Sequence, residues 1–268
     1  NISLRHPKNV KKGITIGKGT QACVFVVSFN GDPTDTKYCC KQYIGKNLAD
    51  YEGAMMGHIR KISNIAERIP CHPMMINIGL VLKLYDGTLS DKFPKNLEDL
   101  KDLFEDLRNT LLMVHRCFSK TRGIMHRDIK PDNIFAESIF GKDGSVIGYT
   151  WVIGDWGTAA MFNSGKTGIP TTVAKTRVFT PEFAHVSILK GGYPKPEHDI
   201  TSLGLTMLHV SKKIKNDKNH APCNNTRQML INRHNDLKEG PDWIRGTPGT
   251  LGGGTDTLDA DSKVDADS

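Results

Sequence analysis

The segment 126–133 (HRDIKPDN) places a carboxylate, two cations and a carboxamide within eight residues. In such a loop Asp128 could accept a proton, Lys130 could lie beside a migrating negative group, and Asn133 could offer an oxygen to a metal ion. A polar turn, with Asp128 as a cap and Pro131 as a stop, uses similar residue types. The complete string is rare by chance, which favours a catalytic loop.

A glycine-rich stretch near the N-terminus is predicted to form the tip of a β-hairpin. Ile14 and Ile16 alternate with polar residues, residues 17–22 (GKGTQA) interrupt the pattern, and apolar residues resume from 23 to 29. Glycines let backbone N–H groups approach phosphate oxygens without an intervening side chain. Because a strand and not a helix follows, a Rossmann-type unit is disfavoured.

A second cation and two possible partners come next. Residues 37–43 (KYCCKQY) are predicted to form a strand that carries Lys41, although an edge strand also uses lysine for solubility. An amphipathic helix is predicted from residue 48 to residue 68. It contains Glu52 and Glu67, and either carboxylate could pair with Lys41.

Asp155 follows another predicted strand. Residues 134–135 and 149–153 are expected to pair as a hairpin, with its turn at 141–144, and Gly154-Asp155-Trp156-Gly157 ends the second strand. Upstream, residues 96–120 show the spacing of a long amphipathic helix that leads into the 126–133 loop.

The order of these motifs resembles the eukaryotic-type protein kinases of the serine/threonine subclass. The similarity covers residues 14–210 and rests on the HRDxxxxN string, the glycine loop ending at Val24, and Asp155-Trp156-Gly157 in the place of D-F-G. Ala22 stands where a third glycine would be, and the hairpin turn is longer than the family pattern needs. The implied fold is α+β and bilobal. A small β-rich N-lobe, made of a five-stranded sheet and one helix, is followed by a mainly helical C-lobe.

The resemblance implies a role for each polar residue. Asp128 would orient the substrate hydroxyl with Lys130 beside it, and Asn133 and Asp155 would hold Mg²⁺. Lys41 would bind the phosphates of ATP.

Glu52 is favoured over Glu67 as the partner of Lys41, because its distance from the strand around Leu82 suits a helix followed by two strands. Residues 76–85 resemble the strand that enters the hinge between the lobes. The implied nucleotide-binding residues are Ile16, Gly17, Lys18, Gly19, Thr20, Gln21, Ala22, Val24, Lys41, Glu52, Lys83 and Tyr85.

Residues 159–180 resemble an activation loop closed by Thr180-Pro181-Glu182. Arg127 could pair with a phosphate added there, and Thr176 is equally plausible as a packing contact to Asp128 and Lys130. A helix from 198 to 210 would contribute Asp199, which anchors the catalytic-loop backbone. The possible phosphate acceptors are Thr167, Thr171, Thr172 and Thr176.

The expected domain organisation is an N-terminal extension (1–11), an N-lobe (12–85), a C-lobe (86–245) and a disordered acidic tail (246–268). The resemblance fades after residue 210, so the C-lobe is truncated, divergent or completed by a regulatory partner. Three arginines (227, 233 and 245) stay open as partners of Glu182. The tail has too few apolar residues to fold.

Composition narrows the class of protein. The 268 residues are 38% hydrophobic and carry a net charge of +7, which suits either anionic ligands or a solvated basic surface. Aromatic and basic residues do not interleave, so no nucleic-acid partner is predicted. Six cysteines without a C-x-x-C pair indicate reduced thiols in the cytoplasm or nucleus. No apolar run is long enough for a membrane span.

Two functions are consistent with these patterns. The favoured one is an active serine/threonine kinase that uses ATP and Mg²⁺ on a protein substrate. The alternative is a pseudokinase-like scaffold that binds nucleotide and acts through a protein partner, suggested by the incomplete C-lobe and Trp156. A small-molecule phosphotransferase is disfavoured, because Thr180-Pro181-Glu182 suits a protein substrate.

Overall fold

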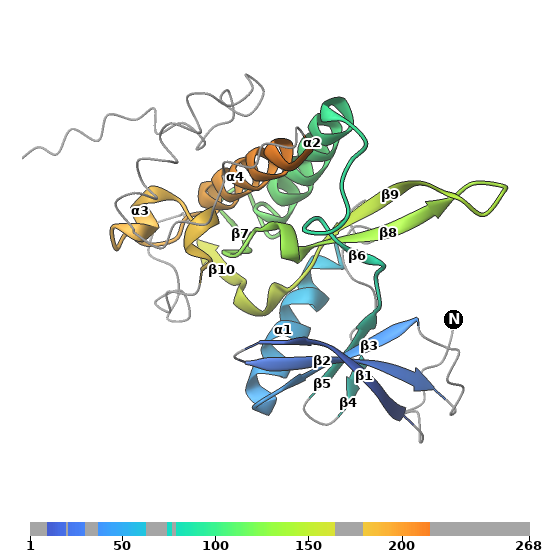
Figure 1. Ribbon diagram of the computed structural model, residues 1–268. Helices are drawn as coiled ribbons and strands as arrows, with labels where there is room; N and C mark the ends of the chain where they lie inside the picture. The colour runs from blue at the N-terminus through green and yellow to red at the C-terminus, as the bar shows by residue number, and fades with distance from the viewer. Residues whose placement is uncertain are drawn as a thin grey trace, which may run out of the picture.

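A computed structural model describes residues 10–19, 21–29, 37–62, 74–76, 79–163 and 179–214. Figure 1 shows a twisted sheet with one helix against it, followed by two long helices and smaller β-ribbons. The predicted α+β class, with a β-rich first part and helices later in the chain, is confirmed.

The N-terminal sheet has five antiparallel strands, as the resemblance implied. Their spatial order is β1-β2-β3-β5-β4. The single strand expected at 76–85 was wrong, because Ile76 pairs with Gly79 and the two residues therefore belong to separate antiparallel strands. The strand bounds are β1 Val10–Lys18, β2 Ala22–Phe29, β3 Tyr38–Tyr43, β4 Met74–Ile76 and β5 Gly79–Lys83.

Helix α1 (Lys46–Ile59) packs one face into the core. The prediction of 48–68 was wrong at both ends: the helix begins earlier, and Arg60 already caps its C-terminus. Isoleucine, serine and asparagine at 62–65 are weak helix formers, and the apolar stripe that docks the helix is complete at Ile59. Its buried residues are Ala49, Glu52, Met55, Met56 and Ile59. A carboxylate on this apolar face needs a partner.

Helices α2 (Leu97–Val114) and α4 (Pro196–Ile214) pack side by side (Figure 1). The side chain of Asn96 caps α2 by accepting hydrogen bonds from two backbone N–H groups at 2.8 and 2.9 Å. The helix ends at Val114 and not at 120, because the chain turns back: a Cβ on Gly123 would lie 2.0 Å from the carbonyl oxygen of His115.

Short strands hold the loops that contain the candidate site residues. Strand β7 (Arg122–Met125) pairs with β10 (Ala160–Asn163), and β8 (Ile134–Phe140) pairs with β9 (Val146–Ile153) and, at its start, with β6 (Gly87–Thr88). The β8–β9 hairpin is longer than predicted, since its backbone ladder continues to Phe140 and Val146, and Figure 1 shows it projecting from the fold. The predicted turn is present, with Gly144 at φ 80°.

Candidate active site

Lys41 lies between two carboxylates. Its Nζ is 2.8 Å from Oε2 of Glu52 and 2.5 Å from Oδ1 of Asp155. Strand β3 supplies the lysine, α1 supplies Glu52, and the loop after β9 supplies Asp155, so one cation joins three elements that are distant in sequence. The side chains of Glu52 and Lys41 are 1% and 14% exposed, whereas that of Asp155 is 40% exposed.

The charges in this cluster stabilise one another. Burial alone would lower the pKa of the Lys41 ammonium, but the carboxylates of Glu52 and Asp155 raise that pKa above its ordinary value. Partial burial opposes ionisation of Asp155, but Lys41 prevails and lowers the pKa of this carboxyl. Lys41 is therefore a cation and Asp155 an anion at neutral pH.

The catalytic-loop residues converge on Asp128. Its Oδ2 is 3.0 Å from Nζ of Lys130 and accepts from Nδ2 of Asn133 at 3.2 Å. Its Oδ1 accepts hydrogen bonds from both the backbone N–H and the hydroxyl of Thr180, at 2.9 and 2.7 Å. Lys130 also donates to the Thr180 hydroxyl at 2.9 Å. The carboxylate of Asp128 is held in one orientation at the edge of the site.

Asp199, on the buried face of α4, anchors the start of this loop. Its two oxygens accept the backbone N–H groups of His126 at 2.7 Å and Arg127 at 2.8 Å, and Nε2 of His115 donates at 2.9 Å. Arg127 has φ 74°, a left-handed conformation that a non-glycine residue adopts only when its surroundings enforce it. The hydrogen bonds that Asp199 accepts from the loop backbone provide that constraint.

The turn around Asp155 is tightly packed. Trp156 is fully buried, its Nε1 donates to the Ile153 carbonyl at 3.0 Å, and its ring meets His126 edge-on at 4.5 Å. Asp155 itself has φ 56°. A Cβ on Gly154 would collide with the ring of Phe135, which explains the glycine.

The donor set near Asp155 fits Mg²⁺. Among the described residues, no three His, Cys, Asp or Glu side chains gather into a metal site. What the site offers is the Asp155 carboxylate and the amide oxygen of Asn133, whose Nδ2 is occupied with Asp128. Magnesium commonly binds one or two protein oxygens together with substrate phosphates, so this sparse set matches its preference.

The glycine hairpin lies beside Lys41 in the sheet, because Val24 of β2 pairs with Lys41 of β3. Strand β1 ends at Lys18 and β2 begins at Ala22, with the Gly19 N–H donating to the Ala22 carbonyl at 2.8 Å and Gly17 opposite Val24. The Gln21 carbonyl accepts from Ile44 at 3.0 Å, Ile16 is largely exposed, and Thr20 lies outside the described residues.

At the end of β5, Lys83 forms an ion pair with Glu137, and Tyr85 stacks on Phe135 with ring centroids 5.5 Å apart. These contacts connect the segment between the sheet and the helices to strand β8.

A family model described as "Protein kinase domain" matches residues 10–243. The chain belongs to the protein kinase family. Serine/threonine-protein kinase CHK1 of Saccharomyces cerevisiae is 26% identical over 214 residues, which are 76% of this chain and 39% of that protein. CBL-interacting serine/threonine-protein kinase 21 of Arabidopsis thaliana is 25% identical over 212 residues, 74% of this chain and 45% of that protein. A probable serine/threonine-protein kinase of Dictyostelium discoideum is 29% identical over 193 residues, 69% of this chain and 12% of that protein.

The matched region thus spans less than half of each of these three relatives. The predicted membership of the eukaryotic-type serine/threonine kinase family is confirmed. Within the part of the chain that the structure describes, no helix combines the length and the apolar character that a membrane span requires.

Several predicted residues of this kinase lie outside the described ranges. They are Thr20, Glu67, the four possible phosphate acceptors (Thr167, Thr171, Thr172 and Thr176), the arginines at 227, 233 and 245, and the tail 246–268. Of the two predicted helix carboxylates, Glu52 is the one that the structure shows paired with Lys41. Among the residues that the structure describes, Thr180 contacts both Asp128 and Lys130.

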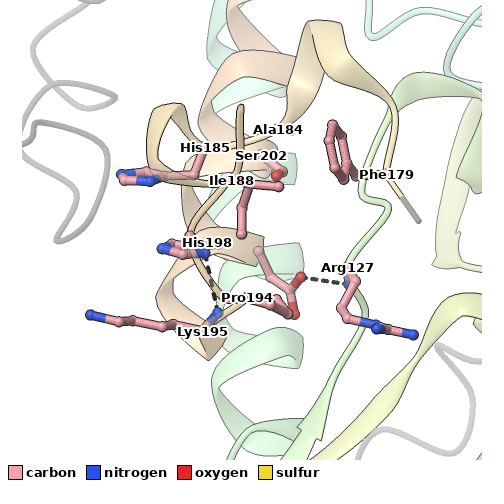
Figure 2. Close-up of a pocket in the computed structure, with 11 residues that line it drawn as sticks. Arg127, Phe179, Ala184, His185, Ile188, Pro194, Lys195, His198 and Ser202 are labelled. Carbon is pink, nitrogen blue, oxygen red and sulfur yellow. Dashed lines mark hydrogen bonds between the residues drawn. The ribbon is translucent and has the colours of Figure 1, made fainter. Parts of the chain in front are cut away.

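A pocket lies beside the 126–133 loop of this kinase-family chain, and its lining includes Arg127 but neither Lys41 nor Asp155. Figure 2 shows the imidazole rings of His185 and His198 next to each other, and their centroids are 4.3 Å apart. Burial, with His185 nearby, lowers the pKa of His198 to about 4, so this ring is neutral at physiological pH. Short segments η5 (Pro181–Phe183) and α3 (Val186–Leu189) border the pocket. Its lining is Arg127, Phe179, Ala184, His185, Ile188, Gly192, Pro194, Lys195, His198, Asp199 and Ser202.

Sequence reasoning missed three contributors to this arrangement. Tyr43 donates a hydrogen bond to Glu52, His115 bonds Asp199, and Phe135 occupies the space beside Gly154. Only Tyr43 carried a usable signal, because residues two apart in a strand share a face and Tyr43 therefore follows Lys41 toward the helix.

Proposed function

We propose that this chain is an active serine/threonine protein kinase that transfers the γ-phosphate of ATP to a protein hydroxyl. The observation that carries the proposal is the joint arrangement of Asp128 beside Lys130 and of Lys41 between Glu52 and Asp155. Relatives named as serine/threonine-protein kinases support a hydroxyl acceptor.

In the proposed reaction the protein chiefly positions the reactants and neutralises negative charge. Lys41, held by Glu52, would contact the nucleotide phosphates. Asn133 and Asp155 would hold Mg²⁺, which when bound neutralises charge on the phosphates. Asp128 would orient the attacking hydroxyl and accept its proton, while Lys130 offsets negative charge on the moving group.

The wider organisation belongs to the same proposal. The N-lobe would comprise residues 12–85 and the C-lobe residues 86–245, with a regulatory partner as one way to complete the latter. Cys23, Cys39, Cys40 and Cys117 are free thiols, which supports a reducing compartment, the cytoplasm or the nucleus.

A nucleotide-binding scaffold is the second candidate. The direct contact between Lys41 and Asp155 favours it, because it occupies the carboxylate that would bind the metal. An active kinase would need this carboxylate for the metal when nucleotide binds, whereas a scaffold would not.

Transfer of labelled phosphate from ATP to a mixed peptide substrate separates the two. Asp128→Ala should lower the rate about 10²–10⁴-fold while nucleotide affinity stays near normal, and Lys41→Met should stop transfer. Asp143→Ala, in the exposed β8–β9 turn, is the matched control and should keep the full rate. A wild-type protein that binds MgATP but transfers no phosphate would establish the scaffold.

A further inference from the structure

Tyr43 lies next to Lys41 on the same face of strand β3. Its hydroxyl donates to Oε2 of Glu52, the same oxygen that Lys41 contacts at 2.8 Å. Tyr43 is 4% exposed and Glu52 is 1% exposed, so water does not compete for this bond. Hydrogen bonds to a buried carboxylate are stronger than neutral ones. Strand β3 therefore holds Glu52 through two donors, of which only one is the lysine.

The surroundings leave the carboxylate little room to move. Nζ of Lys41 lies 5.4 Å from the centroid of the Tyr43 ring, within the range of a cation–π contact. A Cβ on Gly157 would lie 2.7 Å from the same Oε2 of Glu52. The tyrosine, the lysine and the glycine backbone thus enclose Glu52 from β3 and from the segment after Asp155.

Lys41 and Tyr43, the two donors to Glu52, would have different roles when nucleotide binds. Lys41 divides its ammonium between Glu52 and Asp155, and in the proposed reaction the same ammonium would also contact the phosphates. Tyr43 has no such second task. Burial, followed by the charge of Glu52, raises the pKa of the Tyr43 phenol well above its ordinary value, so the hydroxyl keeps its proton at every physiological pH.

We propose that Tyr43 is a positioning residue that keeps Glu52 directed at Lys41 and keeps helix α1 docked while Lys41 engages a nucleotide. The inference rests on the proposed function for the identity of the ligand, but the docking of α1 does not depend on it. Tyr43 acts on the phosphates only through Glu52 and Lys41.

Calorimetric titration with MgATP tests whether Tyr43 affects nucleotide binding through Glu52 and Lys41. Tyr43→Phe retains the ring and should weaken MgATP binding about tenfold, the effect of losing one hydrogen bond to a charged group. In the Lys41→Met background the same substitution should change affinity less than about twofold. Equal weakening in both backgrounds would mean that Tyr43 only supports the fold, and the proposal would be wrong.

Tyr51→Phe is the matched control for these titrations. It removes a tyrosine hydroxyl from α1 itself, whose bond goes to the Ala159 carbonyl at 2.7 Å and not to Glu52. Its effect on MgATP affinity should be the same with and without Lys41→Met. Coupling as large as that of Tyr43 would overturn the specific role.

Amide hydrogen exchange without nucleotide tests the docking of α1. Lys41→Met alone should leave the α1 amides protected within about threefold, because Tyr43 still holds Glu52, and adding Tyr43→Phe should accelerate their exchange at least about tenfold. Fast exchange of the α1 amides in Lys41→Met alone would refute the proposal.

If Tyr43→Phe does not fold, Glu52→Gln replaces it. The amide oxygen still accepts from Tyr43, so the α1 amides should stay protected while MgATP affinity falls. A wild-type protein that binds no MgATP would sink the proposed function, and the exchange experiment would still decide the role of Tyr43.

Discussion

A methyl group at Gly154 should disturb both stability and phosphate transfer. A Cβ built there would lie 2.0, 2.5 and 2.7 Å from three ring atoms of Phe135. The backbone cannot easily move away, because the Gly154 N–H donates to the Asn133 carbonyl at 2.8 Å and the Gly154 carbonyl accepts from Nε2 of His126 at 2.8 Å. Ring or backbone must therefore shift.

The size of the effect follows from ordinary packing. Carbon atoms in contact lie about 3.5–4.0 Å apart. To remove the clash, the Phe135 ring and the new Cβ must therefore move apart by roughly 1.5–2 Å. Overpacking of this kind costs about 1–3 kcal/mol, which for a domain of this size lowers Tm by roughly 2–12 °C. Because Asp155 follows directly, a misplacement of about 1 Å should also reduce transfer about 100-fold.

The experiment compares Gly154→Ala with Gly57→Ala, where an added Cβ on helix α1 meets nothing within 4 Å. Gly57→Ala should raise stability by about 0.5–1 kcal/mol, since alanine loses less backbone entropy in a helix than glycine. Thermal unfolding and labelled-phosphate transfer are the measurements. Gly154→Ala combined with Phe135→Leu should recover part of both losses, because the smaller side chain makes room. Wild-type stability and transfer in Gly154→Ala, or no recovery in the double variant, would show that the collision argument is wrong.

Three further substitutions test the rest of the site. Thr180→Val removes the hydroxyl bonded to Asp128 at 2.7 Å and should lower kcat about 10–100-fold, whereas Thr180→Ser should retain most of the rate. Asp199→Asn should lower the free energy of unfolding in urea by about 2–4 kcal/mol at pH 7, because a buried carboxylate with three donors is lost. Burial opposes ionisation of Asp199, but the hydrogen bond and charge of His115 prevail and lower its pKa. The difference from wild type should therefore be complete above about pH 4 and vanish as the pH falls through the folded-state pKa; a constant difference would contradict this. Trp156→Phe should cost about 1–3 kcal/mol through a cavity and a lost hydrogen bond, and unchanged stability would show that the ring is not packed as described.

The structure differs from sequence-based expectation mainly in the extent of elements. Helix α1 ends at Ile59, because its length depends on how much of its apolar face the sheet can cover. The β8–β9 hairpin extends to Phe140 and Val146, although only residues 134–135 and 149–153 were predicted to pair. Packing against a neighbouring element limits α1, and backbone pairing extends the hairpin; local composition predicts neither contact.

The choice among equivalent residue types also needed the fold. Glu52 and Glu67 were both acceptable partners for Lys41 by residue type, and only the position of α1 against β3 brings Glu52 within 2.8 Å. Thr176, the threonine predicted as a packing contact of Asp128, lies outside the described residues, and within them Thr180 contacts this carboxylate.

From the sequence alone came the kinase family resemblance, the α+β class and the order of the catalytic motifs. These depend on residues within a few positions of one another, where covalent spacing restricts the possible geometry. The tertiary structure decided which distant groups meet: Asp155 with Lys41, Asp199 with the backbone of His126, and Tyr43 with Glu52. The physical reason is that a buried charge is stable only with its partners in place, and packing of whole elements determines which partners are within reach.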